Sequence, residues 1–429
     1  MKEKVLLIGY NFHPELTGIG KYSGEKIDWL LKQGHDCTVI TSYPYYPHWK
    51  VQAPYTGNRF WFKTEKVKGL EGEGDLTIHR CPQYVPSSPT GLKRMFLEFT
   101  FTVSAFFKVL QLLPGKKFDV VINIAPSFQT GLLGALYKKI RGAKLVYHIQ
   151  DMQIEAAKEL GMIKSETILN ALYSIERFIF KRANIISSIS EGMVDKIELK
   201  AGKRVSLFPN WVDTKKFFPV ENKLLLKARF GFKDDDRVVL YSGAVGEKQG
   251  LEVILKTAYD LKSDPTLKFI ICGSGPYKSL LQKMAGELEL KNIRFLPLQP
   301  SEDFNAFLNM AEVHLVIQKR SAGDLVMPSK LTTILAVGGV AVITANEGST
   351  LFSVVNKYQM GIVVEAEDKD ALTKGILKAL SSDRQILQDN ARKYAKEFLC
   401  VDAVMAAFSA EVFRRKENLK TSSLSSESI

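Results

Sequence analysis

The chain has 429 residues, of which 45% are hydrophobic and 24% charged, so its composition excludes a disordered or fibrous protein and is typical of a globular one. This length exceeds what one hydrophobic core supports and predicts two domains of roughly 200 residues each. The net charge of +13 divides into +9 over residues 1–213 and +4 over residues 214–429, so we expect the first half to meet a negatively charged surface or partner.

The N-terminal residues and the cysteines indicate the compartment. The first 15 residues contain only a short apolar run, which predicts a buried strand rather than a secretory signal, so we expect a cytoplasmic protein. The four cysteines, Cys37, Cys81, Cys272 and Cys400, lack metal-ligand spacing, which argues against a disulfide framework and a zinc site. The basic residues lie in no nucleic-acid-binding pattern. An anionic membrane or a phosphate-bearing substrate is therefore favoured over nucleic acid.

Short apolar runs separated by helical periodicities fill the first half of the chain. Because these runs are continuously apolar rather than alternating, they predict parallel strands covered on both faces, and hence a doubly wound α/β sheet. The predicted strands are 5–8, 37–41, 120–125, 145–149, 185–189 and 205–208. The clearest predicted helices between them are 22–33, 130–139 and 169–182.

One region interrupts this alternation. Residues 43–93 are rich in aromatic, proline and basic residues, and we expect such a long insertion to face an acceptor substrate. The segment 92–113 that follows is apolar but contains Glu98 and Lys108. A core helix of the first domain is the favoured interpretation, and a helix lying on a membrane surface is the alternative.

The second half repeats the pattern and predicts a second doubly wound sheet. Its predicted strands are 238–241, 267–272, 293–296, 313–317, 340–344 and 362–365. Prolines and a turn break the periodicity over 208–219, where we place the hinge between a first domain, 1–210, and a second domain, 211–393.

The C-terminal region is helical in pattern over residues 383–416. Little of the second sheet is left for such a helix to cover, so it could return to the first domain. The last residues, 417–429, are serine-rich and polar, and we expect them to be disordered.

The loop after the first strand contains Gly18 and Gly20, just before a helix expected to begin near Lys21. Glycine allows a close approach of the backbone to a ligand, and N–H groups at a helix end suit a phosphate or a sugar oxyanion. The loop lacks the third glycine of the dinucleotide-binding fingerprint and the lysine of a P-loop. It therefore disfavours a nicotinamide enzyme and a nucleoside triphosphatase.

The strand 145–149 ends among residues that can bind or catalyse. His148 and Asp151 lie near the carboxyl end of a predicted parallel strand, where doubly wound sheets bind ligands. An imidazole and a carboxylate there can orient sugar hydroxyls or serve as acid and base, although Asp151 can equally cap the next helix. Ser190 and Glu191 follow the next strand and are expected to line the site near the hinge.

Two loops of the second domain are rich in glycine. Gly243 ends the first strand of this domain, Lys248 is spaced to reach a diphosphate, and Gly250 is expected to start a helix whose dipole adds to that charge. Gly273 and Gly275 follow the next strand. Both loops leave the carboxyl ends of strands and can therefore converge on one ligand.

A third loop contains Pro328, Ser329 and Lys330, which open a short apolar helix. A helix N-terminus beside a lysine suits a phosphate, although an ordinary loop with a solvated lysine is the alternative. Together, three loops at strand ends of one domain predict a nucleotide-diphosphate site.

The segments TGIGKY, PNWVD, GAVGEKQGLE, CGSGP and MPSKLTTILAVGG, in this order, resemble the glycosyltransferase family 4 enzymes of the GT-B fold. The resemblance is closest to the colanic acid biosynthesis type of exopolysaccharide glycosyltransferase and extends from Lys4 to about Lys416. It implies two Rossmann-like domains facing across a cleft, with a C-terminal helix, 394–416, returning to the first. It also implies a nucleotide-sugar donor held mainly by the second domain, an acceptor held by the first, retention of configuration, and no metal or other cofactor.

This chain departs from the family pattern at the donor site. Ala244 stands where many members have arginine, so Lys248 and Lys330 would have to neutralise the diphosphate. The paired glutamates of the family are absent: Thr333 occupies the second position, and Asp324 lies at or beside the first. We expect Asp324 or Thr333 to touch hydroxyls of the donor.

The resulting hypothesis is a peripheral membrane enzyme of exopolysaccharide or capsule biosynthesis. It would transfer a sugar from a GDP- or UDP-sugar, with GDP-fucose as one candidate, to a polyprenyl-diphosphate-linked acceptor at the inner face of the plasma membrane. Positive charge from Lys248 and Lys330 would stabilise the departing diphosphate. A GT-B nucleotide-sugar 2-epimerase and a non-catalytic nucleotide-sugar-binding protein are the alternatives; the long insertion argues against the first, and the missing glutamates favour the second.

Overall fold

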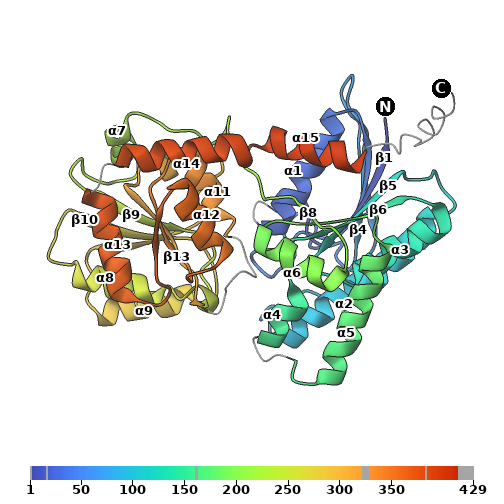
Figure 1. The fold of residues 1–429 in the computed structure, drawn as a ribbon, viewed down its shortest axis with the longest axis horizontal. Helices are drawn as coiled ribbons and strands as arrows, with labels where there is room; N and C mark the ends of the chain where they lie inside the picture. Colours follow the sequence, from blue (N-terminus) through green and yellow to red (C-terminus); the bar gives the residue numbers. More distant parts are fainter. Residues whose placement is uncertain (1, 16–17, 160–162, 321–327, 382–383, 414–429) are drawn as a thin grey trace, which may run out of the picture.

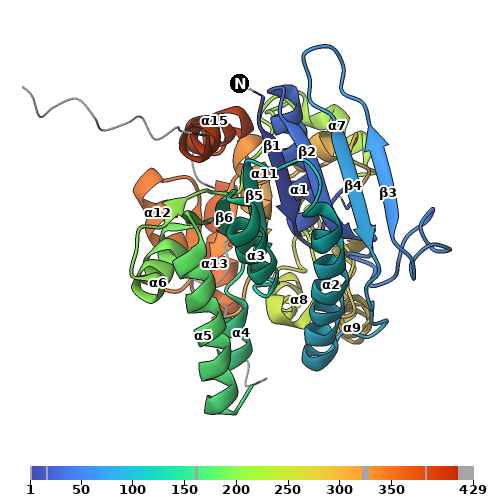
Figure 2. The same cartoon turned by 90° about the vertical axis from the view of Figure 1, so that its right-hand side faces the viewer.

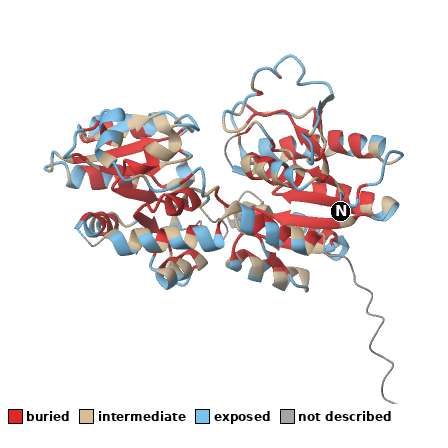
Figure 3. Cartoon of the chain, turned by 90° about the horizontal axis from the view of Figure 1, so that it is seen from above, coloured by how far each residue is buried: buried red, intermediate tan, exposed pale blue. Residues whose placement is uncertain are grey.

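The computed structural model describes all residues except 1, 16–17, 160–162, 321–327, 382–383 and 414–429. The chain forms two lobes, each built on a sheet with helices on both faces (Figure 1). Figure 3 shows the buried residues concentrated in the strands at the centre of each lobe, as expected for parallel sheets covered on both sides.

The first sheet has eight strands in the order β3-β4-β2-β1-β5-β6-β7-β8. Its strands are β1 (Lys4–Ile8), β2 (Asp36–Ser42), β3 (Lys63–Val67), β4 (Leu76–Cys81), β5 (Val120–Ala125), β6 (Lys144–Ile149), β7 (Ile185–Ser188) and β8 (Ser206–Leu207). All pairings are parallel except that of β3, which runs antiparallel to β4. Each predicted strand of the first half is confirmed within a few residues.

Between these strands, the described part of the first lobe forms the helices α1 (Gly18–Lys32), α2 (Gly91–Leu112), α3 (Thr130–Arg141), α4 (Gln153–Glu159), α5 (Glu166–Arg182) and α6 (Glu191–Ala201). Successive strand residues point to opposite faces of the sheet. Leu6 and Ile8 therefore pack with α2, α3 and α5, whereas Val5 and Leu7 pack with α1 and the C-terminal helix.

The structure differs from the sequence analysis at two places in the first lobe. Helix α1 begins at Gly18 rather than near Lys21, so the glycines lie within its first turn. The insertion 43–93, in which the sequence analysis predicted no strand, contains β3 and β4, and β4 pairs in parallel with β2. These strands escape an apolar-run criterion because β3 is an edge strand with no buried residue, and β4 contains polar residues that pair across to it.

The second sheet has six parallel strands in the order β11-β10-β9-β12-β13-β14. Its strands are β9 (Arg237–Ser242), β10 (Leu267–Cys272), β11 (Ile293–Leu296), β12 (Val313–Val316), β13 (Ala341–Thr344) and β14 (Ile362–Val364). The helices of this lobe are α7 (Lys223–Arg229), η1 (Glu247–Gln249), α8 (Glu252–Asp260), α9 (Lys278–Glu287), α10 (Phe304–Asn309), α11 (Lys330–Ala336), α12 (Thr350–Tyr358) and α13 (Lys369–Ser381). All six predicted strands are confirmed.

Two further helices, α14 (Arg384–Phe398) and α15 (Val401–Val412), run end to end from the second lobe to the first (Figure 1). Their junction is fixed by the linker, where Val212 N–H donates to the Leu399 carbonyl at 2.8 Å and Val401 N–H donates to the Val212 carbonyl at 3.1 Å. Helix α15 then buries Phe408 in the first lobe, with its ring 4.5 Å from that of Phe208.

Candidate functional site

The carboxyl edge of the second sheet has a topological switch between β9 and β12, which are neighbours although the chain winds away from them in opposite directions. Crevices at such points are where doubly wound sheets bind ligands. The loops after β9 and β10 stay paired beyond their strands, because Gly243 N–H donates to the Cys272 carbonyl and Val245 N–H donates to that of Ser274, both at 2.9 Å. The two glycine loops are thus one layer of backbone.

This layer is too tight for side chains. A Cβ atom on Gly273 would lie 1.8 Å from the Gly243 carbonyl oxygen, and one on Gly275 would lie 2.0 Å from that of Val245. Only glycine permits this approach of the two backbones. The glycines predicted from the sequence therefore have a packing role first.

Lys330 reaches this layer from the third loop. It is the first residue of α11, and its ammonium nitrogen lies 3.6 Å from the ring centroid of Tyr241. The same nitrogen lies 2.9 Å from where a Cβ atom of Gly243 would be. Burial lowers the pKa of Lys330 to about 7. The structure therefore brings Lys330 together with Gly243, Gly273 and Gly275.

Tyr241 was not predicted as a site residue, yet it contacts both parts of this arrangement. Its ring lies beneath the Lys330 ammonium, and its hydroxyl donates to the Ala244 carbonyl at 2.7 Å. The Tyr241 side chain thus contacts both the loop after β9 and the Lys330 ammonium. The sequence offered no signal for this role, because Tyr241 reads as the last apolar residue of a buried strand.

The other predicted donor residues have different outcomes. Asp324 lies outside the described residues, and Lys248 lies in the short helix η1, with its side chain outside the described part of the structure. Gly250 does not start a helix: it ends η1 with φ +68°, and α8 begins at Glu252. The buried Thr333 hydroxyl donates to the Lys330 carbonyl at 3.0 Å, a bond within α11.

Helices α1 and α11 meet where the two lobes adjoin. Burial raises the pKa of Tyr22 in α1, and a side-chain hydrogen bond with Thr332 in α11 lowers it in part. The Tyr22 ring also packs edge-on against Trp211 of the linker, with centroids 5.3 Å apart. The first turn of α1, with its exposed Gly18, therefore lies at the same junction as Ser329 and Lys330.

A buried glutamate supports the first glycine loop. Glu15 Oε1 accepts hydrogen bonds from the N–H groups of Tyr45 and Tyr46, both at 2.9 Å, and a Cβ atom on Gly20 would lie 2.6 Å from Glu15 Oε2. Burial raises the pKa of Glu15 to about 7 against these hydrogen bonds. Gly20 is therefore required for packing, and Glu15 is a candidate that the sequence did not reveal.

A second buried carboxyl lies at the carboxyl edge of the first sheet. Glu98 of α2 accepts a hydrogen bond from Gln153 Nε2 at 2.5 Å. Burial raises the pKa of Glu98 to about 7, and the nearby carboxylate of Asp151 raises it further. Asp151 also raises the pKa of Tyr10, which burial already raises. Asp151 therefore belongs to a polar group with Glu98 and Tyr10, and a charged residue in an apolar helix was the signal for Glu98.

His148 was expected at the mouth of the strand, and this prediction is wrong. Its side chain lies in the layer between the first sheet and helices α1 and α15, with Nδ1 3.0 Å from Ser187 Oγ and the ring edge-on to Phe208. Burial, with the charge of Lys26, lowers its pKa well below the ordinary value. A neutral, buried His148 packs the core and cannot touch a ligand.

Ser190 and Glu191 lie at the start of α6. Ser190 is the N-cap of this helix, and its hydroxyl accepts from Met193 N–H at 3.4 Å. Glu191 is exposed and lies near α14, where its charge adds to the burial that raises the pKa of Tyr394. The first has a structural role, whereas the second faces the segment that connects the lobes.

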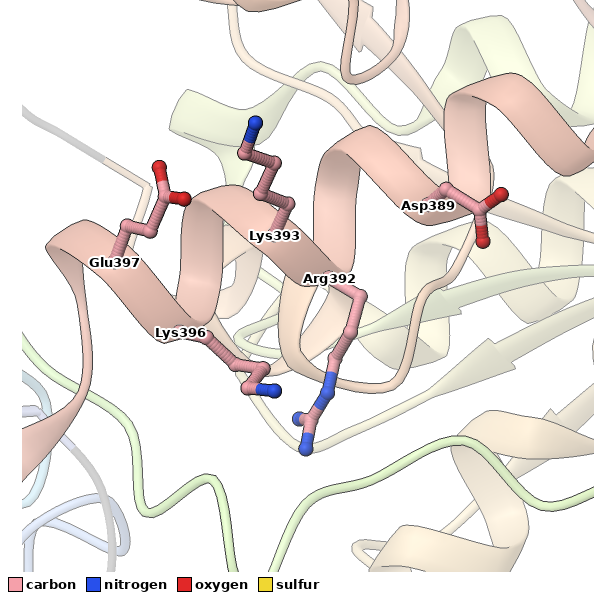
Figure 4. Close-up of a pocket in the computed structure, with 5 residues that line it drawn as sticks. All are labelled: Asp389, Arg392, Lys393, Lys396 and Glu397. Atoms are coloured by element: carbon pink, nitrogen blue, oxygen red, sulfur yellow. The ribbon is translucent and has the colours of Figure 1, made fainter.

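A shallow hollow of about 300 Å³ lies on one flank of α14 (Figure 4). It is lined by Asp389, Arg392, Lys393, Lys396 and Glu397. Arg392 donates to the carbonyls of Phe217 and Ala336 at 2.8 and 2.6 Å, so it fastens the linker to the end of α11. Because this hollow is lined by a single helix of mixed charge, it is not the site of the glycine loops.

Comparison with known proteins identifies the family. Residues 222–398 match the family model described as glycosyl transferases group 1, and residues 17–211 match that of the glycosyl transferase 4-like domain. The Escherichia coli (strain K12) protein named "Putative colanic acid biosynthesis glycosyl transferase WcaI" is 38% identical over 417 residues, 95% of this chain and 99% of that protein.

More distant relatives share parts of the chain or its fold. The GDP-mannose-dependent alpha-(1-6)-phosphatidylinositol monomannoside mannosyltransferase of Mycolicibacterium smegmatis is 27% identical over 210 residues, 47% of this chain and 54% of that protein. The crystal structure of Anabaena Alr3699/HepE in complex with UDP and glucose superposes with a TM-score of 0.66 at 13% identity, covering 96% of this chain and 99% of that one. The latter shows that the fold is GT-B.

Proposed function

The chain belongs to the group 1 glycosyltransferases, and we propose that its donor is a nucleotide-diphosphate sugar and its acceptor a lipid-linked oligosaccharide. The observation that carries the donor assignment is the Lys330 ammonium beside the glycine loops at the switch of the second sheet. Among the described residues, no carboxylate forms an ion pair with it. A bound diphosphate would supply the missing negative charge.

The reaction is proposed to retain the configuration at the anomeric carbon. The bond between that carbon and the diphosphate oxygen breaks, and the acceptor hydroxyl forms the new bond on the same face. The hydroxyl proton passes to the departing phosphate oxygen, so the step needs no protein base. Lys330 stabilises the charge that develops on the diphosphate, which is the largest catalytic effect expected of a preorganised site. No metal or cofactor is required by this scheme.

The acceptor is proposed to bind at the carboxyl edge of the first sheet, where the half-buried Asp151 can orient a sugar hydroxyl. The buried Glu15 and Glu98 hold the surrounding backbone and side chains in place through their hydrogen bonds. The similarity to WcaI supports a role in exopolysaccharide or capsule biosynthesis, and the mannosyltransferase similarity supports a lipid acceptor. The net charge of +9 over residues 1–213 supports peripheral attachment to the cytoplasmic face of an anionic membrane.

The donor assignment is tested with Lys330→Ala. We expect hydrolysis or transfer, measured over a panel of GDP- and UDP-sugars, to fall by about 100-fold or more, because one preorganised charge is lost from the departing group. Lys291→Ala, at an exposed lysine before β11 on the opposite edge of the same sheet, should leave turnover unchanged. If folded Lys330→Ala protein keeps turnover within about threefold of wild type, the assignment is wrong.

The same panel separates the alternative functions. A 2-epimerase would convert the nucleotide sugar to its epimer without any acceptor, which product chromatography detects. A binding protein without turnover would be stabilised thermally by a nucleotide sugar but would release no nucleoside diphosphate.

A further inference from the structure

Helix α2 has two apolar faces. One face packs into the core of the first lobe through Leu97, Phe101, Ala105 and Val109. The residues of the other face are exposed although they are large and apolar, and they recur at intervals of three and four, as a helical stripe requires. They are Leu92, Phe96, Phe99, Val103, Phe106, Phe107 and Leu110.

A neighbouring loop extends this stripe. Phe60 and Trp61 are 71% and 74% exposed, and Phe62 is 42% exposed. The loop is tied to the helix, because the Lys108 ammonium of α2 lies 5.0 Å from the Phe62 ring centroid. We call the α2 stripe and residues 60–62 together the apolar face. Large apolar side chains that are exposed in such number on one part of a monomeric surface mark an interaction site.

The charges around the apolar face are positive. Lys93 and Arg94 are exposed in the first turn of α2, and the Arg59 guanidinium lies 4.7 Å from the Phe60 ring centroid. The only acidic residue of α2, Glu98, is buried on the opposite side. Apolar side chains flanked by exposed lysine and arginine match the headgroup region of an anionic bilayer.

Helix α2 is the one helix among the described residues that is long and apolar enough to cross a membrane by length and composition. Its packing argues against crossing. The strands before and after it, β4 and β5, belong to one sheet, so both ends of α2 must stay on the same side of a bilayer. The helix can therefore lie only along the surface of a membrane, with its exposed stripe toward the lipid.

We propose that the apolar face docks the first lobe on the headgroup boundary of an anionic bilayer, with α2 parallel to the surface. Figure 2 shows α2 at the periphery of the first lobe. The orientation rests on the proposed function. Because Lys63 at the start of β3 pairs with Arg80 near the end of β4, residues 60–62 lie at the carboxyl edge of the first sheet. The same edge carries Tyr10 and Asp151, so docking brings the proposed acceptor site to the membrane.

The test uses the full chain and vesicle flotation. Vesicles contain roughly one-third phosphatidylglycerol in phosphatidylcholine, or phosphatidylcholine alone, at two salt concentrations. The double substitution Phe99→Glu and Val103→Glu should lower partitioning onto the anionic vesicles by about tenfold or more. Lys93→Ser with Arg94→Ser should remove most of the salt-sensitive part of binding.

The matched control places two glutamates on exposed leucines of the second lobe, by Leu280→Glu in α9 and Leu377→Glu in α13. It should float like wild type. Unchanged melting temperatures establish that each variant is folded. If the α2 double variant floats as well as wild type, the proposal is wrong. The proposal is also wrong if the wild-type protein does not bind the vesicles and instead forms a dimer, detected by light scattering, that the α2 double substitution abolishes.

Failure of this proposal and of the proposed function can be told apart. Hydrolysis of a nucleotide sugar by the α2 double variant in vesicle-free buffer should equal that of wild type, because the apolar face does not contact the donor loops. Flotation without any turnover over the donor panel would refute the transferase mechanism and leave the docking surface in place. Turnover without flotation would refute the docking surface and leave the transferase mechanism in place.

Discussion

The pKa of Lys330 is lowered because burying a charged amine is energetically unfavourable, and this pKa decides when Lys330 can bind a diphosphate. Its ordinary pKa of 10.5 falls to about 7 because burial disfavours the charged form. Between pH 7 and 10.5 the unfolded chain therefore holds a proton at this residue that the folded chain has released. Folding stability should rise with pH across that window through this group and should not depend on it below pH 7.

This pKa predicts how donor binding depends on pH. A diphosphate needs the protonated amine, so nucleotide-sugar affinity, measured by calorimetry, should fall by up to about tenfold per pH unit above pH 7. Lys330→Arg should retain its charge and give a flat profile over the same range. A wild-type profile as flat as that of the arginine variant would show that Lys330 does not carry the charge of the site.

The raised pKa values of Glu15 and Glu98 depend on the surrounding fold and not on the residue type alone. Both have a pKa raised to about 7 by burial, although one precedes a glycine loop and the other lies within an apolar helix. Glu15 accepts from the nearby Asn11 but also from Tyr45, 30 positions away, and Glu98 accepts from Gln153, 55 positions away. The position of Glu98 in an apolar helix was a signal in the sequence, but only the fold shows that both carboxyls are removed from water.

Helix α3 packs closely against the first sheet because Gly134 has no side chain. A Cβ atom on Gly134 would lie 1.9 Å from the Asn123 side-chain oxygen of β5 and 2.7 Å from a methyl group of Leu145. The helix can therefore approach the sheet only with glycine at this position. In α9, by contrast, nothing lies within 4 Å of a Cβ atom on Gly286.

These two glycines make a matched pair. Gly134→Ala should destabilise the chain by about 1–3 kcal/mol, because overpacking outweighs the gain of about 1 kcal/mol in helix propensity. Gly286→Ala should stabilise it by about 0.5–1 kcal/mol, since only the propensity gain remains. Urea unfolding followed by circular dichroism measures both. Shifts of the same sign would contradict the packing described for α3.

For helix α2, the structure gives information on burial that the sequence could not give. A core helix and a membrane-surface helix were alternatives, and the structure shows an apolar face on each side. The choice between burial and exposure was made by the neighbouring elements, because the first sheet covers only one side of the helix. The sequence of α2 alone could not indicate which phenylalanines remain exposed.

The two lobes are joined by α14 and α15 as well as by the linker. Helix α15 completes the core of the first lobe, where Phe408 packs against Phe208 and the Lys26 ammonium lies 5.0 Å from its ring centroid. Residues more than 180 positions apart thus share one core, so the C-terminal helix contributes to the stability of the N-terminal lobe.

Phe408→Ala tests this coupling. Loss of a buried phenylalanine should destabilise the first lobe by about 3–5 kcal/mol. All four tryptophans lie within residues 1–213, so tryptophan fluorescence reports the first lobe. Its thermal transition should move down in Phe408→Ala and stay in place in Phe307→Ala, which removes a buried ring from the second lobe. The opposite pattern would show that α15 does not stabilise the first lobe.

The sequence by itself determined the fold class, all strands of the second sheet, six strands of the first and the glycine loops with Lys330, because these depend on local periodicity and on turns within a few residues. It did not determine β3 and β4, whose few buried residues give no apolar run. The family followed from the order of those loops. Only the tertiary structure decided that His148 is a core residue, that Tyr241 supports Lys330, and that Glu15 and Glu98 are buried carboxyls. The physical reason is that burial and partnership are set by elements distant in sequence, so the layer that a strand residue faces is fixed only when the helices have packed.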